Sequence, residues 1–368
     1  MSGQIIDSVR LYKFNIVSGM RARQQLFIEL CAGGRSGWGE CVLSYNRIGA
    51  DLFSIASCFD EYIRGKTVSE AIAGVRCMFG VWRHSLTEAA EFALVDLSGK
   101  LSGRSAASVL VLEHERPVPG VASIVTESPD TAAQKARLAL EAHRARCIRL
   151  RLYGDLEKDR ALIGAVRSIC DEKHTFLIGD AAKCYGSPVR FEVEKLGIKL
   201  IMLHTAGLDA CMDPSEMRLE QWGELSRFVT PLNLVCSYPM QPARLAERLI
   251  YPRMAGMVRV QPGRMGSLYD AVQFAEKVRK LGMMLMIGDD HLIGPGCAAW
   301  QQIAIGTGAD LVEAAEKKRE SELYRRALLY NNVEFRGGAY QLCGGNGGFG
   351  VELDTRVLAR HATQLLEL

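Results

Sequence analysis

The sequence predicts an α/β protein in which a mixed α+β segment precedes a parallel barrel of alternating strands and helices. Two observations predict it. Over about the first hundred residues, strand-like segments give way to a helical spacing of apolar residues. From about residue 120, short apolar runs then alternate with helical patterns, about seven or eight times, which is typical of a parallel barrel. An open doubly wound sheet is disfavoured, because no glycine-rich phosphate-binding fingerprint follows the first of these strands.

Size and composition indicate an ordinary globular protein. The chain has 368 residues, 48% of them hydrophobic, which is enough for one large domain or two unequal ones. Its 45 basic and 42 acidic residues leave a net charge of +3, so neither nucleic acid nor a membrane is expected as a partner. The 11 cysteines form no CxxC pair and are interpreted as reduced core residues. With no signal sequence and no spanning run, we expect a cytoplasmic protein.

The first segment predicts a small antiparallel sheet followed by helices. Three strands are expected, at residues 5–15, 24–31 and 36–42. The connections at 18–23 and 44–51 are the loops expected to set the choice of substrate. From 52 to about 108 the apolar residues take a spacing of three and four, which predicts helices.

The stretch from Cys147 to Tyr185 carries the polar residues of greatest interest. We interpret it as strand, helix and strand, so its two strands should be parallel neighbours. Arg149 and Arg151 alternate along the first strand and share one face, while Asp180 ends the second strand and Lys183 follows it. These four side chains should converge at the mouth of the barrel. Two cations there need neutralisation by Asp180, by another acid or by an anionic ligand.

Other polar residues allow further alternatives. The segment Asp289-Asp290-His291 could cap the next helix as a polar turn, or an Asp could orient His291 as a base. Three dispersed residues at predicted strand ends could bind a softer ion such as Zn²⁺: Asp180, His204 and Cys236.

Four motifs occur in order along nearly the whole chain: Gly37-Trp-Gly-Glu-Cys41, Glu91-Phe-Ala-Leu-Val-Asp-Leu-Ser-Gly-Lys100, Gly263-Arg-Met-Gly-Ser267 and Gly350-Val-Glu-Leu-Asp354. In this order the chain resembles the enolase superfamily, and within it the mandelate racemase and muconate-lactonizing enzyme branch. The resemblance implies an α+β capping domain at 1–118, a modified (β/α)7β TIM-type barrel at 119–342 and a C-terminal return segment at 343–368 that packs on the cap. It also implies a homo-oligomer.

The resemblance implies a chemistry from which the sequence departs at the metal. The family removes a proton α to the carboxylate of a small acid and holds the enediolate on Mg²⁺. Asp180 occupies the first ligand position, but the second is expected in the acid-free segment 200–205, and Cys236 stands at the third. One carboxylate cannot hold Mg²⁺ octahedrally, so we expect the usual metal site to be absent.

The expected bases are changed as well. Arg149 and Arg151 replace the two lysines of the branch, and a guanidinium cannot act as a general base, although it can bind a carboxylate or enolate oxygen. Gln261 stands where the sixth strand of the family has Lys or Asp, and Gly288 where the racemase has its His.

Two functions follow from these observations. The first is a divergent isomerase or lyase that abstracts a proton α to the carboxylate of a small acid, without the usual Mg²⁺. The second is a non-catalytic descendant that binds a ligand or serves as a scaffold. The candidate catalytic residues are Lys183, His291 and Asp290. The candidate substrate-binding residues are Arg149, Arg151, Asp180, Gln261 and Cys236.

Overall fold

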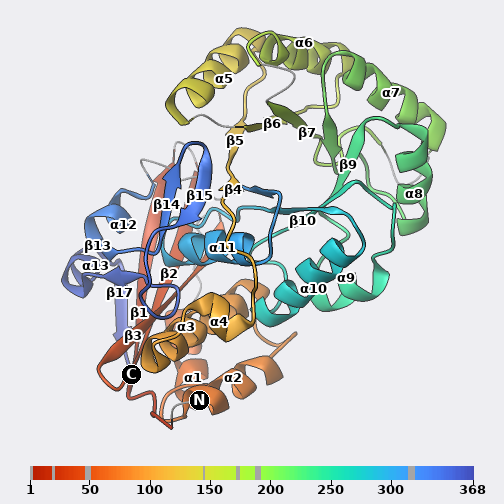
Figure 1. Ribbon diagram of the computed structural model, residues 1–368. Coiled ribbons are helices and arrows are strands. Elements are labelled where there is room, and N and C mark those ends of the chain that lie inside the picture. Colours follow the sequence, from red (N-terminus) through yellow and green to blue (C-terminus); the bar gives the residue numbers. More distant parts are fainter. Residues whose placement is uncertain are drawn as a thin grey trace.

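The computed structural model describes residues 3–18, 21–45, 51–143, 146–170, 175–186, 192–313 and 320–368. A capping domain built around an antiparallel sheet packs against a barrel of parallel strands (Figure 1). Two loops, at 18–23 and 44–51, were expected to set the choice of substrate. Most of their side chains lie outside the described part of the structure.

The cap contains the antiparallel sheet that the sequence predicts. Its first three strands are β1 (Ser8–Ser18), β2 (Arg21–Ala32) and β3 (Arg35–Tyr45); β1 begins and ends later than expected, and β2 and β3 are longer than expected. The helices that follow are α1 (Leu52–Tyr62), α2 (Val68–Cys77), α3 (His84–Ser102) and α4 (Ala106–Leu110). A Cβ at Gly37 or Gly39 of β3 would overlap the backbone of α3. These two glycines therefore let α3 lie directly on the sheet, buried between cap and barrel.

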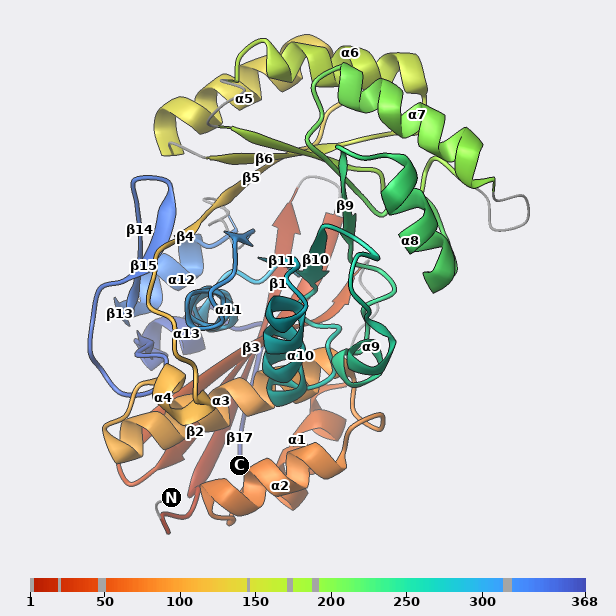
Figure 2. The same ribbon diagram turned by 45° about the vertical axis from the view of Figure 1, so that its right-hand side comes forward.

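The barrel has eight parallel strands joined by helices, as the predicted (β/α)7β fold requires. The strands are β5 (Val121–Ile124), β6 (Cys147–Arg151), β7 (Phe176–Asp180), β8 (Ala210–Met212), β9 (Asn233–Cys236), β10 (Met257–Val260), β11 (Met284–Ile287) and β12 (Leu311–Val312). The helices are α5 (Pro129–His143), α6 (Leu156–Arg167), α7 (Val193–Thr205), α8 (Leu219–Phe228), α9 (Ala243–Leu249), α10 (Leu268–Lys280) and α11 (Pro295–Gly306). A parallel bridge between Gly120 and Val312 joins the two end strands. Figure 2 shows α10 and α11 toward the cap and α5 to α8 on the far side.

The barrel strand that the apolar run predicts at residues 199–204 is wrong. Residues 200–205 belong to α7, whose buried Leu196, Leu200 and Leu203 have the spacing of an amphipathic helix. The fourth barrel strand is β8, which lies further along the chain. It has only three residues, too few for a periodic pattern to be visible in the sequence.

The last part of the chain returns to the cap. The segment forms α12 (Glu322–Ala327), β13 (Leu328–Tyr330), β14 (Val333–Arg336), β15 (Ala339–Leu342), β16 (Glu352–Leu353), α13 (Thr355–His361) and β17 (Gln364–Glu367). Strands β14 and β15 form a small sheet with β4 (Val118–Pro119). Strand β17 pairs with β1, where Arg10 lies opposite Glu367. None of the helices among the described residues combines the length and apolar character needed to cross a membrane.

Candidate active site

The barrel interior changes from apolar to polar toward the carboxyl ends of its strands. A lower cluster of apolar side chains draws on every strand: Val121, Cys147, Ile178, Ala210, Met212, Val235, Met257, Met286 and Leu311. Residues two apart on a strand share a face, so the next inward positions are Ser123, Arg149, Asp180, Ser237, Arg259, Gly288 and Glu313. We call these seven residues the polar layer.

Glu313 is the anionic centre of the polar layer. One carboxylate oxygen lies 2.7 Å from a guanidinium nitrogen of Arg149 and accepts a hydrogen bond from the Ser123 hydroxyl at 2.9 Å. The other oxygen lies 2.7 Å from a guanidinium nitrogen of Arg259. Burial acts to raise the pKa of Glu313, but Arg149 and Arg259 together lower it to about 2. Glu313 is therefore ionised at any working pH.

Asp180 is the second acid of the layer, and the structure brings it together with the two arginines as the sequence predicts. Its Oδ2 lies 3.5 Å from Nη1 of Arg149 and 3.6 Å from Nη1 of Arg151. Arg149 is thus neutralised by two acids, Asp180 and Glu313. Arg151, with 38% of its side chain exposed, lies nearer to solvent at the carboxyl end of β6. Internal pairing, one of the two alternatives for these cations, is present.

Sequence reasoning missed Arg259 and Glu313. The Arg259 guanidinium donates to Glu313, to the Ser237 hydroxyl at 3.4 Å and to the side-chain oxygen of Gln261. Gln261 in turn donates to the backbone oxygen of Asp289 at 3.0 Å, so its amide holds the arginine in place. The available signal was a charge inside an apolar strand, in Met257-Val-Arg-Val260, together with an acid directly after the eighth strand.

An acid does follow the fourth strand, contrary to expectation. Asp213 comes directly after β8, with a φ of 43°. Its Oδ1 accepts hydrogen bonds from the backbone N–H groups of Ser237 at 3.0 Å and Tyr238 at 3.1 Å. Burial raises its pKa to about 6. The residue level with Asp180 on the neighbouring strand is Met212, so Asp213 lies one position beyond the polar layer.

Lys183 and His291 follow the third and seventh strands of the eight, so they lie on opposite sides of the barrel. Lys183 has a φ of 71°, and its Nζ lies 2.8 Å from the centre of the Tyr238 ring. His291 has a φ of 57° and an exposed side chain, and its backbone oxygen accepts from Gln25 of the cap at 3.5 Å.

The structure places three other candidates away from the polar layer. Asp290 packs against Gly263, where a Cβ would overlap its carboxylate. Cys236 is fully buried in the core that the barrel strands share with the outer helices. His204 ends α7, and its Nδ1 lies 2.7 Å from the backbone oxygen of Leu208. Asp180, His204 and Cys236 therefore do not form the alternative Zn²⁺ site.

The strand ends do not fit Mg²⁺. Asp180 already pairs with two guanidinium groups, and one oxygen of Asp213 is taken by two backbone donors. At the end of the fifth strand the inward residue is Ser237, which Arg259 contacts. Among the described residues no group of three His, Cys, Asp or Glu could hold a metal ion. Mg²⁺ needs several free oxygen ligands that neutralise it, and the two acids of this layer, Asp180 and Glu313, are already paired with guanidinium groups.

Three other buried acids hold the cap on the barrel, and a fourth, Asp96, holds the C-terminal segment on the cap. Glu40 of β3 accepts from the backbone N–H groups of Ile293, Gly294 and Gly296 at 2.7–3.1 Å. From α3, Glu88 accepts from Gly263, Met265 and Gly266 at 2.6–3.1 Å, and Glu91 accepts from Ser267 and Leu268. Asp96 accepts from Trp38 and Phe349 and pairs with Lys100. Burial raises the pKa of Glu88 to about 8 and that of Glu91 to about 7. We call Glu40, Glu88, Glu91 and Asp96 the clasp acids.

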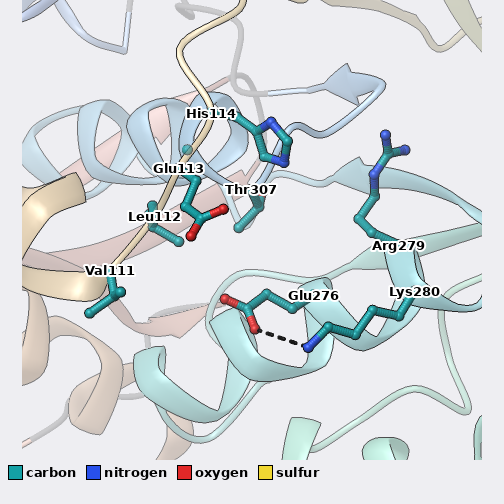
Figure 3. A pocket seen from close by; sticks show the side chains of 9 residues that line it. Val111, Leu112, Glu113, His114, Glu276, Arg279, Lys280 and Thr307 are labelled. Atoms are coloured by element: carbon teal, nitrogen blue, oxygen red, sulfur yellow. Dashed lines mark ion pairs between the residues drawn. The ribbon is translucent and has the colours of Figure 1, made fainter.

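A cavity of about 460 Å³ lies at the other end of the barrel. Figure 3 shows Glu113, His114, Glu276 and Lys280 around it, with Lys280 paired to Glu276. Residues at the end of α10 precede β11, so they lie beside the amino ends of the strands, opposite the polar layer. Its mixed charges partly neutralise one another and favour no ligand of one sign.

The fold and the polar layer define a capped parallel barrel with an ionic interior. No protein-family model and no curated protein sequence matches the chain. Solved structures do. A dipeptide epimerase from Cytophaga hutchinsonii, complexed with Mg and a dipeptide, has a TM-score of 0.81 at 15% identity over 99% of both chains. An L-talarate dehydratase from Polaromonas, complexed with Mg and L-glucarate, has a TM-score of 0.76 at 18% identity over 99% of both chains.

A third similar structure, from Listeria innocua, is described as a member of the enolase superfamily. It has a TM-score of 0.77 at 16% identity over 99% of both chains. The chain therefore has the same fold as these structures, one of which is described as an enolase-superfamily member, and this confirms the fold that the resemblance implied.

Proposed function

We propose that the chain is an isomerase- or lyase-type enzyme that moves a proton α to the carboxylate of a small acid, as a racemase, epimerase, cycloisomerase or dehydratase does. The observation that supports this most is the polar layer, which puts guanidinium groups at the carboxyl ends of barrel strands under a cap. Sites of barrel enzymes lie at this end. The similar structures include an epimerase and a dehydratase that bind acids.

Arg151 is the residue we assign to the substrate carboxylate. Its side chain is 38% exposed, and among the described residues its ion pair is the long one to Asp180. A guanidinium presents two parallel donors to a carboxylate, and this geometry also stabilises an enolate oxygen. Arg149 and Asp180 hold the fork in position. This arrangement needs no Mg²⁺, because fixed guanidinium charge takes over the electrostatic stabilisation.

Lys183 and His291 are the groups we assign to proton transfer. They follow strands on opposite sides of the barrel, so they can approach an α-carbon from its two faces. Removal of a proton on one face and its return on the other inverts a stereocentre. Asp290, which precedes His291, is the acid we assign to its orientation.

Deuterium wash-in tests the proposal. The protein is incubated in D₂O with EDTA and a panel of dipeptides, aldarates and 2-hydroxy acids, and exchange at the α-carbon is followed by NMR. We expect exchange with at least one acid, and loss of this exchange in Arg151→Met. The control is Arg279→Met, which should retain it, because Arg279 pairs with Asp310 far from the mouth of the barrel. Absence of exchange across the panel, in folded protein, would refute the activity.

The second candidate is a non-catalytic descendant that binds a ligand or serves as a scaffold. The observation in its favour is that Asp180 and Glu313 already neutralise Arg149, and Glu313 neutralises Arg259. Calorimetric titration of the same panel separates the candidates. Binding of an acid that depends on Arg151, with no deuterium exchange, identifies a binding protein, and neither binding nor exchange leaves the scaffold.

A further inference from the structure

We propose that the guanidinium of Arg259 is the resident cation of this barrel. It lies in the polar layer, beside the strand ends at which the enolase-superfamily resemblance implies a divalent ion, and it neutralises Glu313 there. The inference does not depend on the proposed activity, because it concerns which charge the folded barrel contains.

The contacts of Arg259 come from several strands. The guanidinium donates to Glu313 beyond the eighth strand, to Ser237 beyond the fifth and to Gln261 beyond its own, the sixth. Its side chain is only 6% exposed. A flat group with five donors, bonded on several sides in a buried interior, holds its charge at a fixed position as a coordinated ion does.

The charge of Arg259 also reaches the acids of the third and fourth strands. Burial acts to lower the pKa of Arg259, but Glu313, and then Asp180 and Asp213, raise it above its ordinary value. In return Arg259 lowers the pKa of Asp213 against the effect of burial. One guanidinium thus pairs with Glu313 and also contributes favourable charge to Asp180 and Asp213.

Gly288 of the seventh strand provides the room for this cation. Its φ lies outside the left-handed region, so the backbone there does not require glycine. A Cβ at this position would instead overlap the guanidinium carbon and nitrogens of Arg259. Glycine stands here at the position that carries the His in the racemase pattern, and the guanidinium of Arg259 occupies the space that a side chain would need.

Chemical rescue tests the inference. Arg259→Ala removes the cation and leaves a space that fits a free guanidinium ion. We expect its Tm to fall by about 5 °C, since breaking a buried ion pair leaves an uncompensated charge. Guanidinium at about 10 mM should restore about 2 °C of the loss by mass action. Urea at the same concentration, which has the same shape and no charge, should restore none.

The matched control is Arg279→Ala, which removes an arginine paired with Asp310 at 2.7 Å outside the barrel interior. We expect no difference between guanidinium and urea in this variant or in the unmodified protein. Equal effects of guanidinium and urea on Arg259→Ala, or an equal rescue of Arg279→Ala, would overturn the inference.

A second pair of variants covers the case in which Arg259→Ala does not fold. Arg259→Lys keeps the charge on a shorter side chain, and Arg259→Gln keeps hydrogen-bonding groups without the charge. If Arg259 acts as a cation, the Lys variant should melt at least about 3 °C above the Gln variant. A Gln variant as stable as the Lys variant shows that the charge is dispensable and refutes the inference.

Discussion

The clasp acids and Glu313 of the polar layer are all buried but have different partners. Glu40, Glu88 and Glu91 accept hydrogen bonds mainly from backbone N–H groups, and burial raises the pKa of each. Glu313 is bound by two guanidinium groups, and its pKa is lowered to about 2. The backbone N–H partners of the first group need only an oxygen acceptor, so these acids can be protonated without losing their role. The guanidinium partners of Glu313 need its negative charge.

This difference explains what the family-like motifs encode. Glu40 belongs to the first motif, and Glu91 and Asp96 belong to the second. Glu91 accepts from Ser267 of the third motif, and Asp96 accepts from Phe349, next to the fourth. The first three motifs therefore lie where the cap contacts the barrel, and the fourth lies where the C-terminal segment contacts α3 of the cap. They specify how these parts pack, and they leave the chemistry of the polar layer free to change.

The largest expected effect is the loss of a clasp acid. Glu40→Ala leaves three buried backbone donors without an acceptor, so we expect a loss of about 3–5 kcal/mol in the free energy of unfolding. Denaturant titration measures it. Glu157→Ala, at a site 77% exposed, is the control and should change stability by no more than about 0.5 kcal/mol. A loss below about 1 kcal/mol for Glu40→Ala would contradict the role of the clasp.

The same substitution at one acid of each kind sharpens the comparison. Glu313→Gln leaves Arg149 and Arg259 without their shared anion and should lower stability by about 3 kcal/mol. Glu91→Gln keeps an oxygen for the backbone N–H of Leu268 and should lower stability by no more than about 1 kcal/mol. Denaturation midpoints of the two variants decide the matter. Equal losses would mean that the two groups of acids do not differ.

Stability should depend on pH in a direction set by the clasp. The pKa of Glu88, about 8, and that of Glu91, about 7, exceed their unfolded values, so the folded protein retains protons that the unfolded chain releases. This contribution is complete below the unfolded pKa and is lost as pH rises through the folded values. The Tm should therefore fall between pH 5 and 9, and less steeply in the double variant Glu88→Gln/Glu91→Gln. A Tm that rises over this range would contradict the assignment.

Glu313 should act in the opposite direction. Its folded pKa of about 2 lies below the unfolded value, so its contribution is present at neutral pH and is lost as the pH falls toward 2.

The smallest expected effect concerns magnesium. Addition of Mg²⁺ at about millimolar concentration should leave the Tm unchanged, because binding to the folded state would raise it by mass action. Asp180→Asn should change stability or anion binding without changing the metal content measured by elemental analysis. A rise in Tm that EDTA reverses would show that oxygen ligands are available in spite of the guanidinium groups.

The fold was largely predictable from the sequence, since it depends on periodic patterns in long segments. The alternation of apolar runs and helical spacing predicted the barrel, and among these runs the one at 199–204 was assigned to a strand although it belongs to a helix. There a helix of 13 residues precedes a strand of three, Ala210–Met212. The order of apolar residues could not separate them, because both are buried against the same core.

The site was predictable only in part. Arg149, Arg151 and Asp180 lie on two adjacent strands of one βαβ unit, so local spacing was enough to bring them together. The pairing of Arg149 and Arg259 with Glu313 joins residues more than fifty positions apart and depends on closure of the barrel. Cys236 points outward because its neighbour Val235 takes the inward position, a matter of register that strand length alone does not fix.

The pairing of β17 with β1 has a consequence for the order in which the chain is made. Arg10 and Glu367 are separated by 357 positions, so one edge of the cap sheet stays open while the ribosome synthesises the whole barrel. An open strand edge readily pairs with other chains. The edge of β1 is therefore closed only after the last residues of the chain have been made and β17 has paired with it.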